Sequence, residues 1–378
     1  MRIAQVAPLF ESVPPQAYGG TERIVHYLTE ALVDVGEEVT LFASGDSRTS
    51  ARLVPNCPHA LRLDASCRDH FAPHVVMLEE VARRADEFDV IHFHCDYLHY
   101  PLSRRSGYRH VTTLHGRLDM PELQPLYREF ADVPLVSISN AQRKPLPLAH
   151  WVATVPHGLP ADLYAGNERP GDYLAFLGRI SPEKGLDRAI EIALRVGIPL
   201  RVAAKVDRAD REYFRVRIEP LFERAGKLVE FIGEIGEAQK QDFLGQARAL
   251  LFPIDWPEPF GLVMIEAMAC GTPVIAFDCG SVPEVIDDGV TGFIVSSVDE
   301  AVEAVGRSGE IDRGACRRVF ERQFTAPRMA NDYLQVYRTV MERRSSDARR
   351  GASRIPAATP AAAALPLDTV AMRSAAEK

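Results

Sequence analysis

Residues 258–273 read EPFGLVMIEAMACGTP, and this stretch predicts the fold of the chain better than any other. Its apolar centre, residues 260–269, predicts a buried helix, and the Gly-Thr-Pro sequence at 271–273 predicts where that helix ends. An apolar run with strand character, Val274–Phe277, follows directly. A helix placed between short apolar strands is typical of a parallel α/β domain.

Two carboxylates in this stretch, Glu258 and Glu266, lie eight positions apart. At about 100° per residue, a helix would offset them by roughly 80°, so they do not face each other as the acid/base pair of a glycosidase does. Glu266 lies among apolar neighbours, where a buried charge is costly without a polar partner. That partner is either a bound ligand or an arginine elsewhere in the chain, and the sequence leaves both interpretations open.

The composition is that of a soluble globular enzyme with two domains. The chain has 378 residues, of which 46% are hydrophobic and 25% are charged. Its net charge of -8 argues against nucleic acid as the main partner, because phosphate binding needs a basic surface. The six cysteines form no CxxC pair, so we expect free thiols and a cytoplasmic location. No segment approaches the roughly 18 apolar residues of a membrane span, and no basic amphipathic helix predicts contact with a membrane surface.

In the first half of the chain, short apolar runs alternate with helical patterns, which predicts a parallel sheet covered by helices. A helix is expected over Thr21–Val35, because Ile24, Leu28 and Leu32 fall on one face and Gly36 follows. The predicted strands are Ile3–Leu9, Val39–Phe42, Val90–Phe93, His110–Leu114 and Leu135–Ser139.

Proline and glycine become dense at 151–171, which predicts a connector to a second α/β series. Its predicted strands are Tyr173–Leu177, Leu200–Ala204, Leu228–Ile232, Ala249–Phe252 and Val274–Phe277, and its predicted helices cover 185–196, 209–225, 237–247 and 260–269. A last helix is expected at about 325–343. The segment 345–378 is rich in Ala, Pro, Ser and Arg and is predicted to be disordered. We therefore expect one domain at 1–155 and a second at 156–324.

The segment Leu177–Gly185 follows the first strand of the second domain and opens a helix. Its two cations, Arg179 and Lys184, lie at a strand-to-helix loop and make a candidate anion site, for which a diphosphate is the natural occupant. Both would offset the charge of a leaving diphosphate, although cations in loops are more often simply solvated. Two open α/β domains also imply a cleft between the carboxyl ends of their sheets, where such a ligand binds.

Candidate residues of the first domain follow its predicted strands. Gly19 and Gly20 either allow backbone to approach a phosphate or a sugar closely or form a plain flexible loop, and no GxGxxG dinucleotide fingerprint accompanies them. His115 ends a strand and could hydrogen-bond a substrate hydroxyl. His92 and His94 would share one face of a strand, for which a metal site is the alternative interpretation. The chain lacks zinc-ligand spacing and an Asp-x-Asp pair, so no metal is expected.

Together these residues resemble the retaining nucleotide-sugar glycosyltransferases of family 4, which have the GT-B fold of two Rossmann-like parallel-sheet domains facing a central cleft. The resemblance covers roughly residues 1–343. Its most specific element is the pair Glu258 and Glu266 with seven residues between them, and Phe260, Gly261 and residues 271–274 add to it. It also implies that the last helix crosses back onto the first domain and completes it.

The resemblance implies a role for each candidate residue. Arg179 and Lys184 would bind the donor diphosphate. Glu258 would hold hydroxyls of the donor sugar, and Glu266 would accept the ribose hydroxyls, which supplies a polar partner. His115 would lie near the reacting anomeric carbon. The donor-binding set is completed by residues that would contact the sugar, the phosphate or the nucleobase: Gly19, Gly20, Glu234, Ile235, Phe260, Gly261 and Leu262.

The implied activity is metal-independent transfer of a hexose, with retention of configuration, from a nucleotide-diphosphate sugar to a hydroxyl of a saccharide, a lipid-linked sugar or a small molecule. No cofactor is expected, since in this family the departing phosphate is thought to deprotonate the acceptor while the protein supplies positioning and electrostatic stabilisation. The alternatives are a sugar-nucleotide epimerase with the same fold and a non-catalytic nucleotide-sugar-binding protein. The sequence specifies neither the donor nucleobase (UDP, GDP or ADP) nor the acceptor.

Two parts of the chain depart from the family pattern or lie outside it. His157 stands in the connector where the family often has Asn before Gly, which leaves the hinge unspecified. On the acceptor side, His94, Arg117 and Asp119 are candidates for lining residues.

Overall fold

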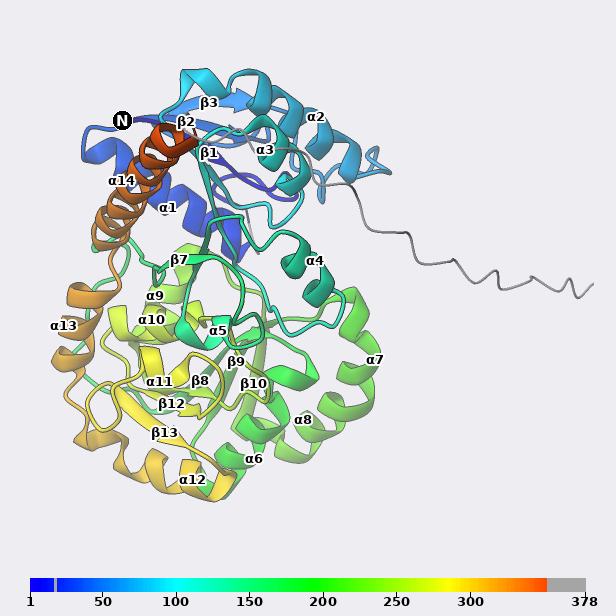
Figure 1. Cartoon of the computed structure of the whole chain (residues 1–378). Helices are drawn as coiled ribbons and strands as arrows, with labels where there is room; N and C mark the ends of the chain where they lie inside the picture. The colour runs from blue at the N-terminus through cyan, green and yellow to red at the C-terminus, as the bar shows by residue number, and fades with distance from the viewer. Residues whose placement is uncertain (17–18, 352–378) are drawn as a thin grey trace, which may run out of the picture. The chain divides into compact units, whose positions relative to one another are not determined.

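The computed structural model describes residues 1–16 and 19–351, with side chains described as far as Glu342. Residues Met1–Met341 form one compact unit that contains two sheets, and the two-sheet parallel α/β fold predicted from the sequence is confirmed (Figure 1). The remaining unit, Glu342–Lys378, is described only in its helical part, up to Gly351.

The first sheet has seven parallel strands in the order β3-β2-β1-β4-β5-β6-β7. These strands are β1 (Arg2–Val6), β2 (Glu38–Ala43), β3 (Arg52–Pro55), β4 (Val90–Phe93), β5 (His110–Thr113), β6 (Leu135–Ser137) and β7 (Trp151–Thr154). The sequence predicted five of them and missed β3 and β7, the two edge strands. Both are short and incompletely buried, so they lack the continuous apolar run that identifies a central strand.

The second sheet has six parallel strands in the order β10-β9-β8-β11-β12-β13. These are β8 (Tyr173–Arg179), β9 (Leu200–Lys205), β10 (Val229–Gly233), β11 (Ala247–Phe252), β12 (Val274–Phe277) and β13 (Gly292–Val295). Five were predicted and the edge strand β13 was missed. The first strand of the chain also ends at Val6 rather than at the predicted Leu9, because the residues that follow turn into the loop toward α1.

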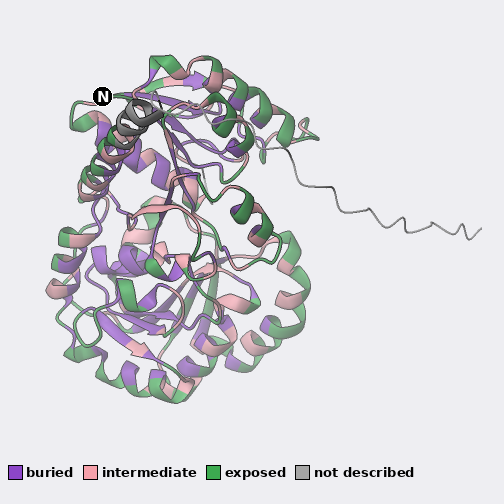
Figure 2. Cartoon of the chain, viewed as in Figure 1, coloured by how far each residue is buried: buried purple, intermediate pink, exposed green. Residues whose placement is uncertain are grey.

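Helices cover the sheets, with their outward faces exposed and the strands largely buried (Figure 2). They are α1 (Gly20–Asp34), α2 (Phe71–Arg83), α3 (Tyr100–Ser106), α4 (Leu123–Glu129), α5 (Asn140–Arg143), α6 (Leu186–Val196), α7 (Arg211–Tyr213), α8 (Glu219–Ala225), α9 (Glu237–Gly245), α10 (Leu262–Ala269), α11 (Val282–Val285), α12 (Val298–Arg307), α13 (Arg313–Gln323) and α14 (Ala326–Gly351). The segment predicted as a helix over 209–225 is helical along its length, although not as one regular α-helix. It is divided by the π-helical turn Phe214–Ile218, after which Pro220 lies in the first turn of α8.

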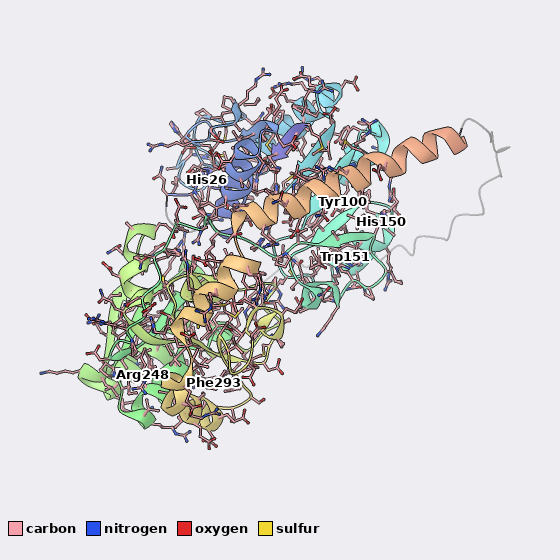
Figure 3. All side chains as sticks on the ribbon, turned by 90° about the vertical axis from the view of Figure 1, so that its left-hand side faces the viewer. His26, Tyr100, His150, Trp151, Arg248 and Phe293 are labelled. Carbon is pink, nitrogen blue, oxygen red and sulfur yellow. The ribbon has the colours of Figure 1, made fainter. Side chains whose placement is uncertain are left out.

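A separate apolar cluster packs beside β5 and β6. Tyr100 is fully buried there with Leu114, Tyr127 and Leu135, and Trp151 packs against the same cluster. Figure 3 shows Tyr100 and Trp151 near one another in this part of the molecule, whereas Arg248 and Phe293 belong to the half that holds the second sheet. Within the described residues, no helix has both the length and the apolar character needed to cross a membrane.

The order of the strands determines where a ligand can bind. β1 lies between β2 and β4 in the first sheet, and β8 lies between β9 and β11 in the second. The connections that leave such neighbouring strands diverge to opposite faces of the sheet, and a crevice opens at the carboxyl ends of the strands. The loops after β1, β4, β8 and β11 are therefore the expected walls of a binding site.

The last helix, α14, contacts the first sheet through two tyrosines. The Tyr337 hydroxyl lies 3.0 Å from Gln5 Nε2 and 2.8 Å from His92 Nδ1, and the Tyr333 hydroxyl lies 2.8 Å from Thr113 Oγ1. The helix extends to Gly351, past its predicted end at about 343 and into the segment predicted to be disordered. The rest of that segment, 352–378, lies outside the described residues.

Arg313 on α13 bonds to several segments of the second half of the chain, so replacing it tests how much these bonds stabilise the fold. Its buried guanidinium donates at 2.6–2.9 Å to three carbonyl oxygens and one hydroxyl, those of Asn167, Gly245, Ala247 and Thr272. Arg313→Leu should lower the free energy of unfolding by about 3 kcal/mol or more, because several buried acceptors would lose their donor.

Urea unfolding measures this change, and the control variant is Arg318→Leu on the same helix. Arg318 forms an exposed ion pair with Asp312, so its loss should change the free energy of unfolding by less than about 1 kcal/mol. Equal effects of the two variants would contradict the structural role of Arg313.

Candidate functional site

A cleft of about 770 Å³ opens at the carboxyl ends of both sheets. Residues from both halves of the chain line it, and they include all of the catalytic and donor-binding candidates. These are Gly19, Gly20, His115, Arg179, Lys184, Glu234, Ile235, Glu258, Phe260, Gly261, Leu262 and Glu266. The fold thus brings together residues that are distant in the sequence.

Each group of candidates lies where a strand ends. Gly19 and Gly20 end the loop after β1, and His115 follows β5 by two residues. Arg179 is the last residue of β8, and the loops after β10 and β11 carry Glu234 and Glu258. Ligands of open α/β sheets bind outside the carboxyl ends of the strands, and the candidates lie at these ends.

Glu258 is buried, and two donors hold it in place. Lys184 Nζ and Trp256 Nε1 both donate to Oε2 of this carboxylate, the latter at 3.0 Å. Gly280 packs against the Glu258 backbone at a φ of 61°, and a Cβ at this position would lie 2.3 Å from the Glu258 nitrogen. Only glycine accommodates both the close approach and the left-handed conformation, so residue 280 fixes the loop that carries Glu258.

Glu266 is buried in the second turn of α10 and is paired with two cations. Arg23 on α1 donates to Oε1, and Lys240 on α9 donates to the same oxygen at 3.0 Å. Burial alone would raise the pKa of Glu266, but the charges of Arg23 and Lys240 outweigh it and hold the pKa at about 2. The ion pair to an arginine that the sequence left open is therefore present, and Glu266 still lines the cleft.

The anion-binding candidates also have internal partners. The Arg179 guanidinium donates to Glu183 Oε1 at 2.6 Å and lies 3.6 Å from Asp210 Oδ2. Lys184 lies 4.7 Å from the centre of the Trp256 ring in addition to its bond with Glu258. The cations of this wall are thus half-buried, oriented by neighbouring groups and close to the start of α6.

Four histidines extend from the cleft into the first sheet. His94 Nδ1 lies 2.9 Å from His115 Nε2, and the His157 ring stacks on that of His115 at a centroid distance of 5.3 Å. Burial lowers the pKa of His115 to about 3 and the pKa values of His92, His94 and His157 well below their ordinary value, so all four are neutral at pH 7.

The metal alternative for His92 and His94 finds no support in this arrangement. Both ring nitrogens of each histidine lie within 3.0 Å of polar groups of the protein. In the part of the chain that the structure describes, no group of three His, Cys, Asp or Glu residues is placed to hold a metal ion.

Two of the three residues expected on the acceptor side line the cleft. His94 and Arg117 line the cleft, and the Arg117 guanidinium lies 5.7 Å from the centre of the Trp256 ring. Asp119 instead serves as the partner of Arg117, with which it forms two hydrogen bonds of 2.7 Å. Glu22 also lines the cleft, and burial raises its pKa to about 7.

Sequence reasoning missed Arg23, Lys240 and Trp256, which hold the two glutamates. Trp256 could have been identified, since it lies two residues before Glu258 next to a proline. Arg23 and Lys240 give no such signal, because each is an ordinary cation within a helix. Only the fold brings them to Glu266, which lies far from Arg23 in the sequence.

Glu266→Gln should lower the free energy of unfolding by about 3–5 kcal/mol at neutral pH, because two buried cations would lose their counter-charge. The pKa of Glu266 in the folded protein, about 2, lies below its ordinary value of 4.5. Its ionised form therefore contributes stability fully above the ordinary pKa, and this contribution is lost as the pH falls toward the folded value. The difference between wild type and variant should shrink below about pH 4.5.

Urea unfolding at several pH values measures this difference. Glu310→Gln is the control, because Glu310 forms an exposed ion pair with Arg307 and its replacement should matter little at any pH. A difference between Glu266→Gln and wild type that stays constant as the pH falls would contradict the account of the buried pair.

Comparison with known proteins gives the same picture of the fold. The family model described as glycosyl transferases group 1 matches residues 166–308, and the model described as Glycosyltransferase Family 4 matches residues 18–157. The boundary between the two matches lies in the segment predicted as the connector.

Relatives and solved structures match over nearly the whole chain. A phosphatidyl-myo-inositol mannosyltransferase of Mycobacterium leprae is 26% identical over 377 residues, which covers 90% of this chain and 97% of the relative. A sucrose-phosphate synthase from Thermosynechococcus elongatus superposes with a TM-score of 0.72 at 20% identity, covering 90% of this chain and 99% of that one. Anabaena HepE, solved with UDP and glucose, gives a TM-score of 0.70 at 16% identity, with 90% and 100% covered.

The two structural likenesses show that the fold is GT-B, as the resemblance implied. The family models and the mannosyltransferase relative extend this from fold to family. The chain belongs to glycosyltransferase family 4.

Proposed function

We propose that this glycosyltransferase moves a hexose from a nucleoside-diphosphate sugar to a hydroxyl acceptor, with retention of configuration and without a metal ion. The observation that carries the proposal is the meeting of Arg179 and Lys184 with Glu258 and Glu266 in one cleft, at the switch point of the second sheet. Two cations and two carboxylates in one cleft suit such a donor, because its diphosphate needs cations and the hydroxyls of its sugar and ribose need acceptors.

Arg179 and Lys184 would bind the diphosphate and stabilise its charge as it leaves. Arg179 ends β8, Lys184 lies in the turn just before α6, and α10 begins at Leu262 in the lining of the same cleft. The first backbone N–H groups of a helix have no acceptor within that helix and favour an anion. The backbone at Phe260, Gly261 and Leu262 would therefore contact the phosphate or the sugar.

Each glutamate keeps an oxygen for a substrate hydroxyl. The described donors to Glu258 both reach Oε2, and those to Glu266 both reach Oε1. The second oxygen of each carboxylate would accept from the donor, Glu258 at the sugar and Glu266 at the ribose. Glu234 and Ile235, in the loop after β10, would lie against the nucleobase, and Gly19 and Gly20 would approach from the first sheet.

Retention is proposed because Glu258 is engaged by Lys184 and Trp256, which suits it to hold hydroxyls rather than to attack the sugar. The departing phosphate would instead take the proton of the acceptor hydroxyl on the face from which it leaves. His115, neutral and beside the cleft, would contact the sugar near the reacting carbon.

Two related proteins support the substrate classes. HepE was solved with UDP and glucose, which supports a nucleotide-sugar donor, and the M. leprae relative, a phosphatidyl-myo-inositol mannosyltransferase, supports an acceptor hydroxyl on a lipid-linked polyol. We retain a cytoplasmic location as part of the proposal.

The test starts from a thermal-shift screen against UDP, GDP and ADP sugars, because a bound donor raises the melting temperature. Transfer is then assayed with the best donor, and the anomeric configuration of the product is read by NMR. The proposal predicts a product with the configuration of the donor. Release of an epimer would favour an epimerase, and tight binding without turnover would favour a non-catalytic binding protein.

Lys184→Ala and Glu258→Ala should each reduce transfer by at least about 100-fold while the protein stays folded, because each removes a contact to the diphosphate or the reacting sugar. The matched controls are Lys227→Ala and Glu230→Ala, which change the same residue types in the same half of the chain but outside the cleft lining. Near-normal turnover in either cleft variant would contradict the site assignment.

A further inference from the structure

A continuous line of hydrogen bonds joins α14 to the cleft. The Gln5 amide is its centre: its Nε2 lies 3.0 Å from the Tyr337 hydroxyl and its Oε1 lies 2.8 Å from His94 Nε2. His94 Nδ1 then lies 2.9 Å from Nε2 of His115, which lines the cleft. Gln5, His94 and Tyr337 are buried, so water does not compete for these contacts.

The Gln5 amide fixes the direction of this line. Its Nε2 can only donate, to the Tyr337 hydroxyl, and its Oε1 can only accept, so His94 Nε2 carries a hydrogen. A neutral imidazole has one N–H, which leaves His94 Nδ1 as an acceptor and makes His115 Nε2 the donor to it. By the same rule His115 Nδ1 carries a lone pair.

The lone pair of His115 Nδ1 has no hydrogen-bond donor among the described residues, and the atom is buried. The ring is held in its plane by stacking on His157, which itself packs edge-on against Phe260 of the donor-binding loop. A buried acceptor at the cleft wall is costly to leave unpaired and suits a ligand that donates.

We propose that Gln5, His94 and Tyr337 are positioning residues that hold His115 as the Nε2–H tautomer, so that its Nδ1 accepts a hydrogen bond from a substrate hydroxyl. The inference rests on the proposed function for the identity of the substrate, a sugar donor or its hydroxyl acceptor. It adds a direction: His115 receives a hydrogen bond from the substrate and does not donate one. It also makes the last helix of the chain part of the site in the first sheet.

The line of hydrogen bonds continues beyond Tyr337, and these further bonds affect how strongly the donor and acceptor roles along it are fixed. His92 lies 2.8 Å from the Tyr337 hydroxyl and 2.7 Å from Thr113 Oγ1, which in turn lies 2.8 Å from the Tyr333 hydroxyl. If the Gln5 amide were turned over, every bond from Tyr333 to His115 would reverse, and His115 would present an N–H to the cleft. The reversed direction is therefore a concerted alternative that a measurement can distinguish.

Long-range ¹H–¹⁵N correlation NMR of the full chain, labelled at histidine nitrogens, reads the tautomer without any substrate. The signals of His115 are assigned by their loss in His115→Gln. We expect a protonated Nε2 and an unprotonated Nδ1 for both His94 and His115 at pH 7. A protonated Nδ1 on His115, or an average of the two tautomers, would overturn the assignment.

Tyr337→Phe then tests the link through α14. It removes the hydroxyl that accepts from Gln5 and keeps the ring, so the Gln5 amide is free to turn and the tautomers of His115 should mix. We expect the His115 nitrogen shifts to move toward their average and kcat for transfer to fall about tenfold, with the donor KM within about twofold of wild type. Tyr173→Phe is the control, because it removes a buried hydroxyl bonded at 2.7 Å to the Phe243 carbonyl in the second half.

The two proposals fail in different ways. Wild-type nitrogen shifts and kinetics in Tyr337→Phe, with transfer intact, would overturn the positioning role while leaving the glycosyltransferase function standing. An Nε2–H tautomer in a protein that transfers no sugar from any nucleotide donor would overturn the proposed substrate while leaving the tautomer assignment standing.

Discussion

The ion pair between Glu266 and Arg23 is the interaction on which the arrangement of the cleft depends. Glu266 lies in an apolar helix that packs in the core of the second half, where its charge is costly without cations. One of its two cations, Arg23, comes from α1, the first helix of the chain, and a Cβ added at Gly20 of the same helix would lie 3.7 Å from Leu262 Cδ1 of α10. The Glu266 carboxylate therefore connects α1 of the first half of the chain to α9 and α10 of the second, because its buried charge is paired with cations from both halves.

Other charged residues of the cleft are paired as well, because a partly buried charge is costly without a counter-charge. Glu258 with Lys184 and Arg179 with Glu183 repeat the arrangement of Glu266 with Arg23. Each pair is oriented by its partner before a ligand binds, which reduces the ordering cost of binding. The neutral histidines of the first sheet complement these charged pairs, because uncharged rings accept or donate hydrogen bonds without competing for the diphosphate.

The sequence was sufficient for the fold class and for finding residues that line the cleft, and the reasons are physical. Central strands such as β4 and β12 are short apolar runs that are buried along nearly their whole length, whereas the edge strands β3 and β7 are only partly buried. The edge strand β13 was missed although Gly292–Val295 is itself a largely buried apolar run. Glu258, Arg179 and Lys184 could be recognised because each lies next to glycine or proline, at or beyond the end of a strand. Arg23 and Lys240 could not, because their function depends on how the helices pack, which no local pattern encodes. The link from Tyr337 to His115 is likewise a property of tertiary structure alone.

Equilibrium binding of a nucleoside diphosphate and its monophosphate, to wild type and to Lys184→Ala, tests the central claim most directly. The nucleoside is the one whose diphosphate raises the melting temperature most. If the cleft is built around a donor diphosphate, the extra affinity that the second phosphate gives should fall about tenfold or more in Lys184→Ala, whereas the monophosphate should bind within about twofold of wild type. Equal weakening of both ligands, or no change in either, would contradict the account.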